Sequence, residues 1–382
     1  MIKSLSCSVI SESEFVNKNS IICNELNNPK LFDQLEHHGK VSSYIDLNFK
    51  HIKFMTFNSV VHYYDQEYKY ERKSIQQQLI YKTNKKINSG TFGSIYYGKY
   101  KIIFHKGYDS INNKTQINKV QNNYKVIDVA IKMICHSDAR DNENNEIDIL
   151  YELSDIPDTI HLFNYSIDPI TKNCMLVMEL CEGGDLFNYF IKNQKKFTDK
   201  CIKNIIIWII NIIKECHKRG IFHSDIKLEN IGLKYKNNCS ILRLLDFGGS
   251  KFICDNDGKY IEYNGIVSSP SYTSPEILSK IYDYEIKQIP KNYQIIGDNL
   301  FKIDIWTIGI VLYILCTGIP PYAGKTINST LEKIAQGKPP NMNQLKDNVD
   351  LCDLILGFLD YNPETRITLD EALVHPYLSM TN

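Results

Sequence analysis

The sequence predicts an α+β protein with a bilobal fold, in which a small β-rich N-terminal lobe precedes a larger helical C-terminal lobe. Residues 80–133 contain strand-like stretches broken by Gly and Asn, whereas helical patterns dominate after residues 183–184. The 382 residues exceed the usual size of one compact domain, and 43% of them are hydrophobic, which is enough for a real core. Such an arrangement is expected to leave a cleft between the two lobes.

The first half of the chain is expected to be mainly strands with one helix. Five stretches have the pattern of strands, and they cover residues 80–86, 95–104, 126–133, 159–167 and 174–180. Residues 107–123 are rich in Asn and Lys, so they are expected to form a surface insertion. Ile147, Leu150 and Leu153 recur at helical spacing, so residues 143–153 are predicted to be a helix.

The second half is expected to be mainly helical. Thr198 is the expected N-cap of a long apolar helix that ends before Gly220 in the C′ position. Strands around residues 231–233 and 242–245 are expected to form a hairpin through an Asn-Asn turn. Helical patterns then continue from Ile303 to the end.

Composition excludes several classes of protein. Lys plus Arg and Asp plus Glu both number 44, so no global charge favours nucleic acid or an acidic membrane, and no nucleic-acid partner is expected. Eleven cysteines without metal-ligand spacing indicate reduced thiols in an intracellular protein, expected in the cytoplasm. The apolar runs 205–213 and 303–316 are too short to span a bilayer, so no membrane span is expected.

Two motifs in the β-rich part suit a nucleotide but are weak alone. Residues 87–95 (INSGTFGSI) lie between two predicted strands, where glycines let backbone amides approach phosphate oxygens. Residues 129–132 (VAIK) end a strand with a lysine that could pair with phosphates. Taken alone, a simple β-turn and a surface lysine are the better explanations of these two patterns.

A third motif is much more specific. Residues 223–230 (HSDIKLEN) contain Asp225, Lys227 and Asn230, and Asp246 opens a DFG sequence that follows Asn230 by 16 residues. Phosphoryl transfer needs a carboxylate that orients a hydroxyl nucleophile, together with an amide and a second carboxylate that hold Mg²⁺. The alternative, polar residues that merely cap loops, fits this order and spacing poorly.

These motifs resemble those of the eukaryotic-type serine/threonine protein kinase family, over residues 81–378. Further landmarks follow in the family's order, namely Glu146, the stretch 176–181, Asp185, Ser274-Pro275-Glu276, Asp304 and Arg366. The resemblance implies a kinase domain at 79–379, with lobes at about 79–181 and 182–379, preceded by an extension at 1–78 of unknown role. It also implies ATP and Mg²⁺ as cofactors and proteins bearing Ser or Thr as substrates.

The resemblance also implies a role for each site residue. The catalytic residues would be Asp225, Lys227, Lys132 and Glu146. The metal would be held by Asn230 and Asp246. The ATP-binding residues would be Ile87, Asn88, Ser89, Gly90, Thr91, Phe92, Gly93, Ser94, Ile95, Ala130, Lys132, Met178, Glu179, Cys181 and Asp185. Lys227 and Ser269 stand where members specific for Ser and Thr carry Lys and Thr.

The chain departs from the family's pattern at four places. Asn88 replaces the first glycine of the flap, and Asn tolerates left-handed backbone conformations. Ser224 replaces the arginine that receives a phosphate of the activation segment, so activity without that phosphate is expected. Gly232 replaces a leucine beneath the adenine, so weaker ATP binding is expected. The segment 279–300, between the Ser-Pro-Glu motif and Asp304, is longer than is usual in the family and is expected to be a surface loop.

Other functions remain open at this stage. Asn88 and Gly232 would suit a pseudokinase that serves as a nucleotide-binding scaffold, although every catalytic residue is present. A small-molecule kinase of related fold is disfavoured by the Ser-Pro-Glu motif. Residues 50–54 resemble a motif for docking to a type-1 phosphatase through Ile52 and Phe54, and a plain β-strand produces the same alternation.

Overall fold

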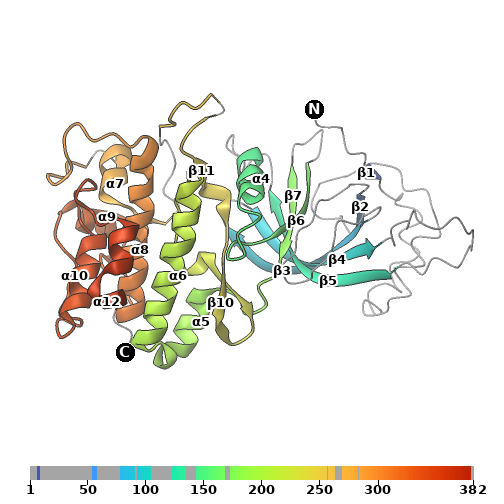
Figure 1. Cartoon of the computed structure of the whole chain (residues 1–382), viewed down its shortest axis with the longest axis horizontal. Coiled ribbons are helices and arrows are strands. Elements are labelled where there is room, and N and C mark those ends of the chain that lie inside the picture. Colours follow the sequence, from blue (N-terminus) through green and yellow to red (C-terminus); the bar gives the residue numbers. More distant parts are fainter. Residues whose placement is uncertain are drawn as a thin grey trace, which may run out of the picture. The chain divides into compact units, whose positions relative to one another are not determined.

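The computed structural model describes ten ranges of the chain, namely residues 7–8, 54–57, 78–90, 93–104, 123–134, 143–167, 173–255, 257–262, 269–282 and 284–379. The chain forms two compact units (Figure 1). One unit contains the strands that precede helix α4 (Glu143–Glu152) together with Phe163–Leu180, and the other contains α4 and everything from Cys181 onward.

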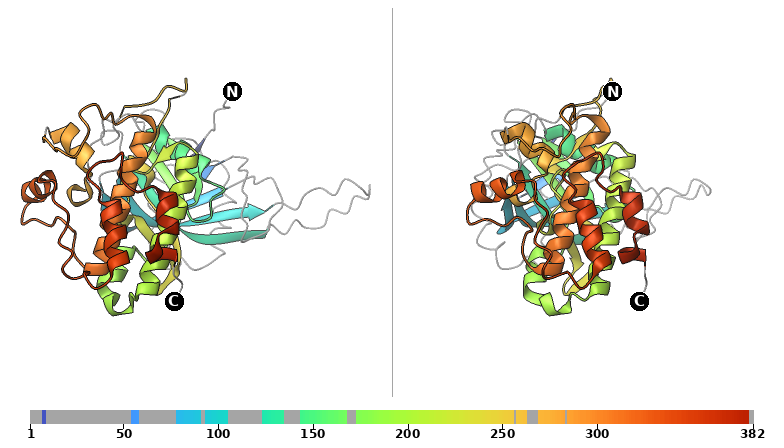
Figure 2. Two further views of the ribbon diagram at one scale, coloured as in Figure 1. Left: turned by 60° about the vertical axis from the view of Figure 1, so that its left-hand side comes forward. Right: turned by 90° about the vertical axis from the view of Figure 1, so that its left-hand side faces the viewer.

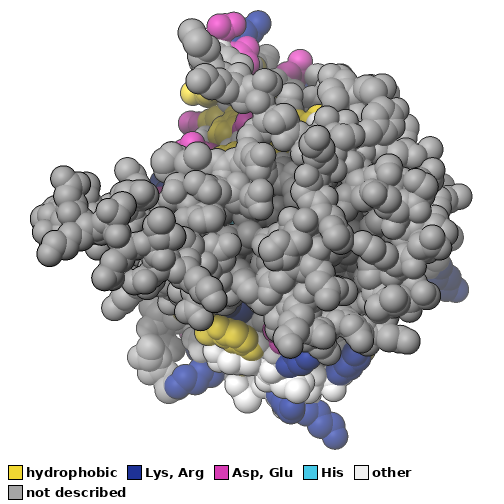
Figure 3. All heavy atoms as spheres, turned by 90° about the vertical axis from the view of Figure 1, so that its right-hand side faces the viewer, with side chains coloured by type: hydrophobic (Ala, Val, Ile, Leu, Met, Phe, Trp, Pro, Cys, Tyr) yellow, Lys and Arg dark blue, Asp and Glu magenta, His cyan; other side chains and the backbone are white. Residues whose placement is uncertain are grey.

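In the face drawn in Figure 3, the described Lys and Arg side chains lie mostly at the lower edge.

The first unit is built around one seven-stranded sheet with the order β1-β2-β3-β4-β5-β7-β6. Its strands are β1 (Cys7–Ser8), β2 (Phe54–Phe57), β3 (Gln78–Gly90), β4 (Gly93–Phe104), β5 (Asn123–Ile134), β6 (Leu162–Ile167) and β7 (Cys174–Glu179). The five predicted strands are thereby confirmed, and β3 to β5 and β7 pair antiparallel. Every second residue of β5, from Val129 through Ile131 to Met133, packs on Met175 and Val177 to form the core of this sheet.

The second unit is mainly helical. Its helices are α4 (Glu143–Glu152), α5 (Leu186–Asn193), α6 (Asp199–Lys218), α7 (Pro275–Tyr282), α8 (Phe301–Thr317), α9 (Ile327–Ala335), α10 (Val349–Phe358), α11 (Leu369–Val374) and α12 (Pro376–Ser379). The short 3₁₀ helices are η1 (Gln194–Lys196), η2 (Leu228–Asn230), η3 (Phe247–Gly249), η4 (Pro270–Tyr272) and η5 (Gly297–Leu300). The strand pairs are β8 (Ile221–Phe222) with β11 (Lys251–Phe252), and β9 (Ile231–Tyr235) with β10 (Asn238–Leu244). The predicted α+β kinase-like fold is confirmed.

The long helix α6 begins and ends where its caps predict. The Thr198 hydroxyl accepts a hydrogen bond from the Cys201 amide at 3.3 Å, and Gly220 ends the helix with a left-handed φ of +68°. The predicted β9–β10 hairpin also forms, with Asn237 at a φ of +58° in its turn. Helices α6 and α8 pack side by side (Figures 1 and 2).

Helix α8 is the buried centre of this unit. Among the described residues, the helical stretch Gly297–Thr317 is the one long and apolar enough to cross a membrane by length and composition. However, 78% of its apolar window is buried inside the unit, and Asp304 has no exposed surface. A core helix of a folded domain explains this pattern better than a membrane span does.

The prediction of a surface loop at 279–300 is confirmed for its middle part only. Residues 284–295 are turns and irregular chain, most of them at least partly exposed, whereas α7 continues to Tyr282 and η5 closes the segment. Ile295 and Leu300 are buried and belong to one apolar cluster with Ile277 and Ile303. The burial of these apolar side chains is what ties the long connection to the helices.

Candidate active site

A buried carboxylate fixes the backbone of the loop that carries the predicted catalytic residues. The Asp304 carboxylate accepts hydrogen bonds from the amides of His223 and Ser224, both at 2.9 Å. His217 Nε2 lies 2.8 Å from the same carboxylate. Because Asp304 is fully buried and holds three donors, it sets the course of the chain directly before Asp225.

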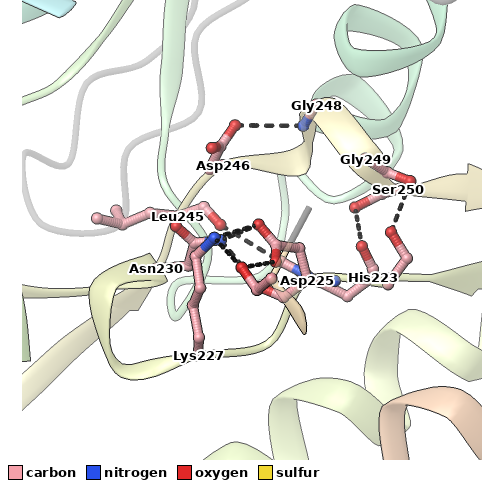
Figure 4. A network of polar contacts seen from close by, with 11 residues as sticks. His223, Asp225, Lys227, Asn230, Leu245, Asp246, Gly248, Gly249 and Ser250 are labelled. Atoms are coloured by element: carbon pink, nitrogen blue, oxygen red, sulfur yellow. Dashed lines mark hydrogen bonds and ion pairs between the residues drawn. The ribbon is translucent and has the colours of Figure 1, made fainter. Parts of the chain in front are cut away.

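The predicted catalytic residues of this loop converge on one carboxylate (Figure 4). Asp225 Oδ2 accepts a hydrogen bond from Lys227 Nζ at 2.7 Å and another from Asn230 Nδ2 at 2.9 Å. Ser269 Oγ donates to Asp225 Oδ1 at 3.3 Å and accepts from Lys227 Nζ at 3.0 Å. Oδ2 is therefore held by two strong donors, and Oδ1 accepts a longer hydrogen bond from Ser269.

The loop is also joined to the DFG sequence through a histidine. His223 is fully buried, its Nδ1 accepts from the Asp225 amide at 3.3 Å, and its Nε2 lies 3.1 Å from the Leu245 carbonyl. Since Nδ1 is the acceptor, the hydrogen bonds assign the proton of the neutral ring to Nε2, which donates to Leu245. The His223 ring also packs on the buried Phe247 ring, at a centroid distance of 5.0 Å.

Asn230 and Asp246 carry the oxygen ligands that a magnesium site needs. Both amide hydrogens of Asn230 point at Asp225, to its Oδ2 and to its carbonyl at 2.8 Å, which leaves the Asn230 amide oxygen for a cation. Asp246 has a left-handed φ of +53°, and its carboxylate accepts from the Gly248 amide at 3.4 Å. Among the described residues no three His, Cys, Asp or Glu side chains gather to hold a metal alone. Mg²⁺ bound through a carboxylate, an amide oxygen and phosphates requires no such group, so these residues fit it.

Ser224 makes a contact that the sequence did not indicate. Its φ is +65°, and its hydroxyl donates to the Gly249 carbonyl at 2.7 Å. In return, the buried Ser250 hydroxyl donates to the His223 carbonyl at 3.1 Å (Figure 4). Asn145 Nδ2 of α4 donates to the Ser250 carbonyl at 2.5 Å. We call these three hydrogen bonds the serine clasp, which joins the catalytic loop, the segment after Asp246 and α4.

Gly232 lies in close contact with the side chains of Cys181 and Leu245. A Cβ atom at this position would lie 2.7 Å from Cys181 Sγ and 3.0 Å from Leu245 Cδ1. A side chain at position 232 would require Cys181 and Leu245 to shift, so close packing favours glycine here. The side chains of Cys181 and Leu245 occupy the space that a leucine at position 232 would fill. The weaker ATP binding expected from Gly232 stays a prediction.

A buried ion pair anchors the end of the predicted activation segment. Arg366 binds the Glu276 carboxylate through two nitrogens, at 2.7 and 2.9 Å, and neither side chain is exposed. Arg366 also donates to the carbonyls of Asp360 and Lys302 and lies over the Trp306 ring. Every charge is thus balanced and hydrogen-bonded, as a buried pair requires. Two of the landmarks that the resemblance named, Glu276 and Arg366, are thus joined in one buried ion pair.

Two acidic residues lie near each other at this site, Glu229 within the loop 223–230 and Asp185 at the start of α5. Asp185, one of the predicted ATP-binding residues, forms the N-cap of α5, where its carboxylate accepts from the Asn188 amide at 2.7 Å and from Asn188 Nδ2 at 2.8 Å. Glu229 Oε2 is buried and has no hydrogen-bond partner among the described residues. Burial first, and then the nearby carboxylates of Asp185 and Asp225, raise the pKa of Glu229.

The β-sheet unit holds most of the predicted ATP-binding residues. In the β3–β4 hairpin, Asn88 pairs with Ile95 and Gly90 with Gly93, and the tip residues Thr91 and Phe92 lie outside the described ranges. Gly93 has a φ of +131°, and a Cβ there would lie 2.4 Å from the Met133 carbonyl, so only glycine fits. The backbone of Asn88 is not left-handed, so the tolerance of Asn for that conformation is not used at this position.

The remaining predicted site residues lie on β5, β7 and α4. Ala130 and Lys132 are buried on β5, and Met178 and Glu179 end β7. Glu146 is buried on α4, which belongs to the other unit, so its pairing with Lys132 stays a prediction. Of the proposed docking residues, Phe54 lies on β2, and Ile52 lies outside the described ranges.

A sheet unit, a helical unit and a loop that gathers Asp225, Lys227 and Asn230 define a protein kinase. A family model for the protein kinase domain matches residues 113–378, so the chain belongs to the protein kinase family. Calcium-dependent protein kinases 4 and 29 of Arabidopsis thaliana are 32% and 34% identical to it over 249 and 252 residues, 65% of this chain in each case. The matched parts are 45% and 42% of those kinases, so the chain spans less than half of their length.

Proposed function

We propose that this chain is a serine/threonine protein kinase that transfers the γ-phosphate of Mg·ATP to hydroxyl groups of protein substrates. The observation that carries the proposal is the hydrogen-bonded group of Asp225, Lys227 and Ser269. In it, Lys227 and Asn230 hold the Asp225 carboxylate, which would orient the substrate hydroxyl and accept its proton. The Lys227 ammonium, 2.7 Å from that carboxylate, stabilises the negative charge on the phosphate in transfer.

Two groups of residues would hold Mg·ATP. Asn230 and Asp246 would hold the metal, which when bound neutralises charge on the phosphates. Lys132, oriented by Glu146, would bind the phosphates from the sheet unit, and the β3–β4 hairpin would cover them. The burial of both Lys132 and Glu146 supports this assignment, because buried charges of opposite sign are retained only where they are paired.

Two further features support the choice of substrate. The Lys227 bond to Ser269 Oγ at 3.0 Å is the arrangement expected where the acceptor is an alcohol of Ser or Thr. The buried Glu229 Oε2, which has no hydrogen-bond partner among the described residues, lies near Asp185 and offers a site for a cation. We therefore expect peptides with Arg or Lys two to three residues before the acceptor to be preferred, since charge-assisted hydrogen bonds of this kind are worth roughly 1.5–3 kcal/mol.

The test is to incubate the purified full chain with Mg·ATP and a degenerate peptide library with Ser, Thr or Tyr as acceptor. The proposal predicts labelling of Ser and Thr peptides that disappears in Asp225→Asn. Labelling of Tyr peptides alone would contradict the acceptor, and labelling of small molecules alone would favour a metabolite kinase. A wild-type protein that binds ATP without labelling any peptide would favour a nucleotide-binding scaffold.

A further inference from the structure

Two thiols lie in contact between α6 and the β9–β10 hairpin. Cys201 lies in the first turn of α6, and Cys239 is the second residue of β10. Their Sγ atoms are 4.0 Å apart, although 38 residues separate them in the sequence. Both side chains are half-buried, so neither is closed off from small solutes. This contact has no part in the phosphotransfer site described above.

The surroundings of the pair are partly apolar. Tyr189 of α5 lies next to it, and burial first, and then the two thiol groups, raise the pKa of that phenol. Burial likewise raises the pKa of Cys201 to about 11, with a further contribution from Cys239. At neutral pH Cys201 is therefore a thiol, which packs stably against Cys239 until an oxidant reaches the pair.

We propose that Cys201 and Cys239 form a modification site, a dithiol that hydrogen peroxide converts reversibly into a disulfide. A disulfide has a sulfur–sulfur distance of about 2.05 Å, so the two sulfurs must approach each other by about 2 Å. Rotation of two half-buried side chains and a small shift of the hairpin supply a movement of that size. The fold of the helical unit thus brings the thiols together before any oxidation occurs.

The reaction balances with peroxide as the only co-reactant. The Cys239 sulfur attacks one peroxide oxygen and loses its proton, a sulfur–oxygen bond forms, the oxygen–oxygen bond breaks, and the leaving hydroxide takes up that proton as water. The Cys201 sulfur then attacks the sulfenic acid, the sulfur–sulfur bond forms, and the oxygen leaves as a second water. In sum, two thiols and one peroxide give one disulfide and two waters, so sulfur is oxidised and peroxide is reduced.

The position of the pair gives the bond a structural consequence. Strand β9 begins directly after Asn230, and β10 ends two residues before Asp246, so the hairpin connects the two residues that fit a magnesium ion. A disulfide at Cys239 would anchor this hairpin to α6. The cross-link closes a loop of 38 residues, which restricts the unfolded chain and stabilises the folded one.

The test treats the full-length protein with hydrogen peroxide, alkylates the remaining thiols and maps linked peptides by mass spectrometry. We expect a Cys201–Cys239 disulfide as the main product, its reversal by dithiothreitol, and a rise in Tm of about 5 °C or more. Cys201→Ser and Cys239→Ser are the test variants, and both should lose the linked peptide and the rise in Tm. Cys352→Ser, which changes a half-buried thiol on α10, is the matched control and should keep both.

Three results would overturn the proposal. The first is peroxide-treated protein in which Cys201 and Cys239 remain reduced while other cysteines oxidise. The second is a disulfide that joins either residue to a different cysteine. The third is a linked Cys201–Cys239 peptide in protein whose Tm falls, because the bond would then distort the fold that is supposed to prepare it.

Discussion

Replacing Ser224 tests the serine clasp directly. In Ser224→Ala the hydroxyl that donates to the Gly249 carbonyl at 2.7 Å is lost, while the left-handed φ of +65° remains. Removing a hydrogen bond of this kind costs about 0.5–1.5 kcal/mol. In Ser224→Gly the same bond is lost, but the strain of a side chain at positive φ, about 1–2 kcal/mol, is relieved. We therefore expect the alanine variant to be destabilised by about 1 kcal/mol and the glycine variant to be close to wild type.

The assay is thermal unfolding of the wild type, Ser224→Ala and Ser224→Gly, measured by calorimetry. A loss of about 1 kcal/mol in a unit of this size lowers Tm by roughly 2–4 °C. Equal losses in the alanine and glycine variants would refute the role of backbone strain. An alanine variant as stable as wild type would refute the contribution of the hydrogen bond.

The clasp also bears on regulation. Because Ser224 is uncharged and its hydroxyl is bound to Gly249, it offers no cationic receptor for a phosphate on residues 246–276. The wild-type protein, dephosphorylated and verified by mass spectrometry, should therefore phosphorylate peptides at an undiminished rate. Activity that collapses on dephosphorylation and returns with a phosphate in this segment would show that another basic residue serves as the receptor.

Three further predictions concern packing, the buried ion pair and substrate choice. Gly232→Leu should overpack against Cys181 and lower stability by about 1–3 kcal/mol, measured by thermal unfolding, and unchanged stability would contradict the close packing. Arg366→Met should cost about 3–5 kcal/mol by leaving the Glu276 charge buried, and adding Glu276→Leu should recover part of it in denaturant unfolding. Glu229→Gln should lower kcat/KM for peptides with Arg before the acceptor by about 10-fold or more and leave neutral peptides unchanged. Because the pKa of Glu229 is raised, the wild-type protein should lose its preference for Arg-containing peptides, on acidification, at a higher pH than an ordinary glutamate would give. A preference for these peptides that survives in Glu229→Gln would refute the contact between Glu229 and the peptide arginine.

The sequence predicts those parts of the site whose residues lie close together in the chain at a fixed spacing. Asp225, Lys227 and Asn230 lie within six residues of one another, so the spacing alone predicts that they meet. The resemblance to the kinase family singles out Ser269 as well, and the structure places its hydroxyl within hydrogen-bond distance of Asp225 and Lys227. Caps are similarly local, which explains why both ends of α6 could be predicted.

Features that depend on distant contacts could not be predicted. The serine clasp uses backbone carbonyls of His223, Gly249 and Ser250, which carry no signal in the residue types. The contact of Cys201 with Cys239 depends on how the hairpin docks on α6. The sequence indicates only that Gly232 lacks a side chain, whereas the structure shows that close packing against Cys181 favours glycine there.

The most direct test of the proposed activity is the rate of phosphate transfer by Asp246→Asn. This substitution keeps the size of the side chain and removes the charge that would hold Mg²⁺. We expect kcat for a Ser/Thr peptide to fall by several orders of magnitude. Tm should stay at the wild-type value, and Asp347→Asn, which changes an exposed carboxylate, should keep full activity. A folded Asp246→Asn protein with near-normal activity would contradict the proposed mechanism.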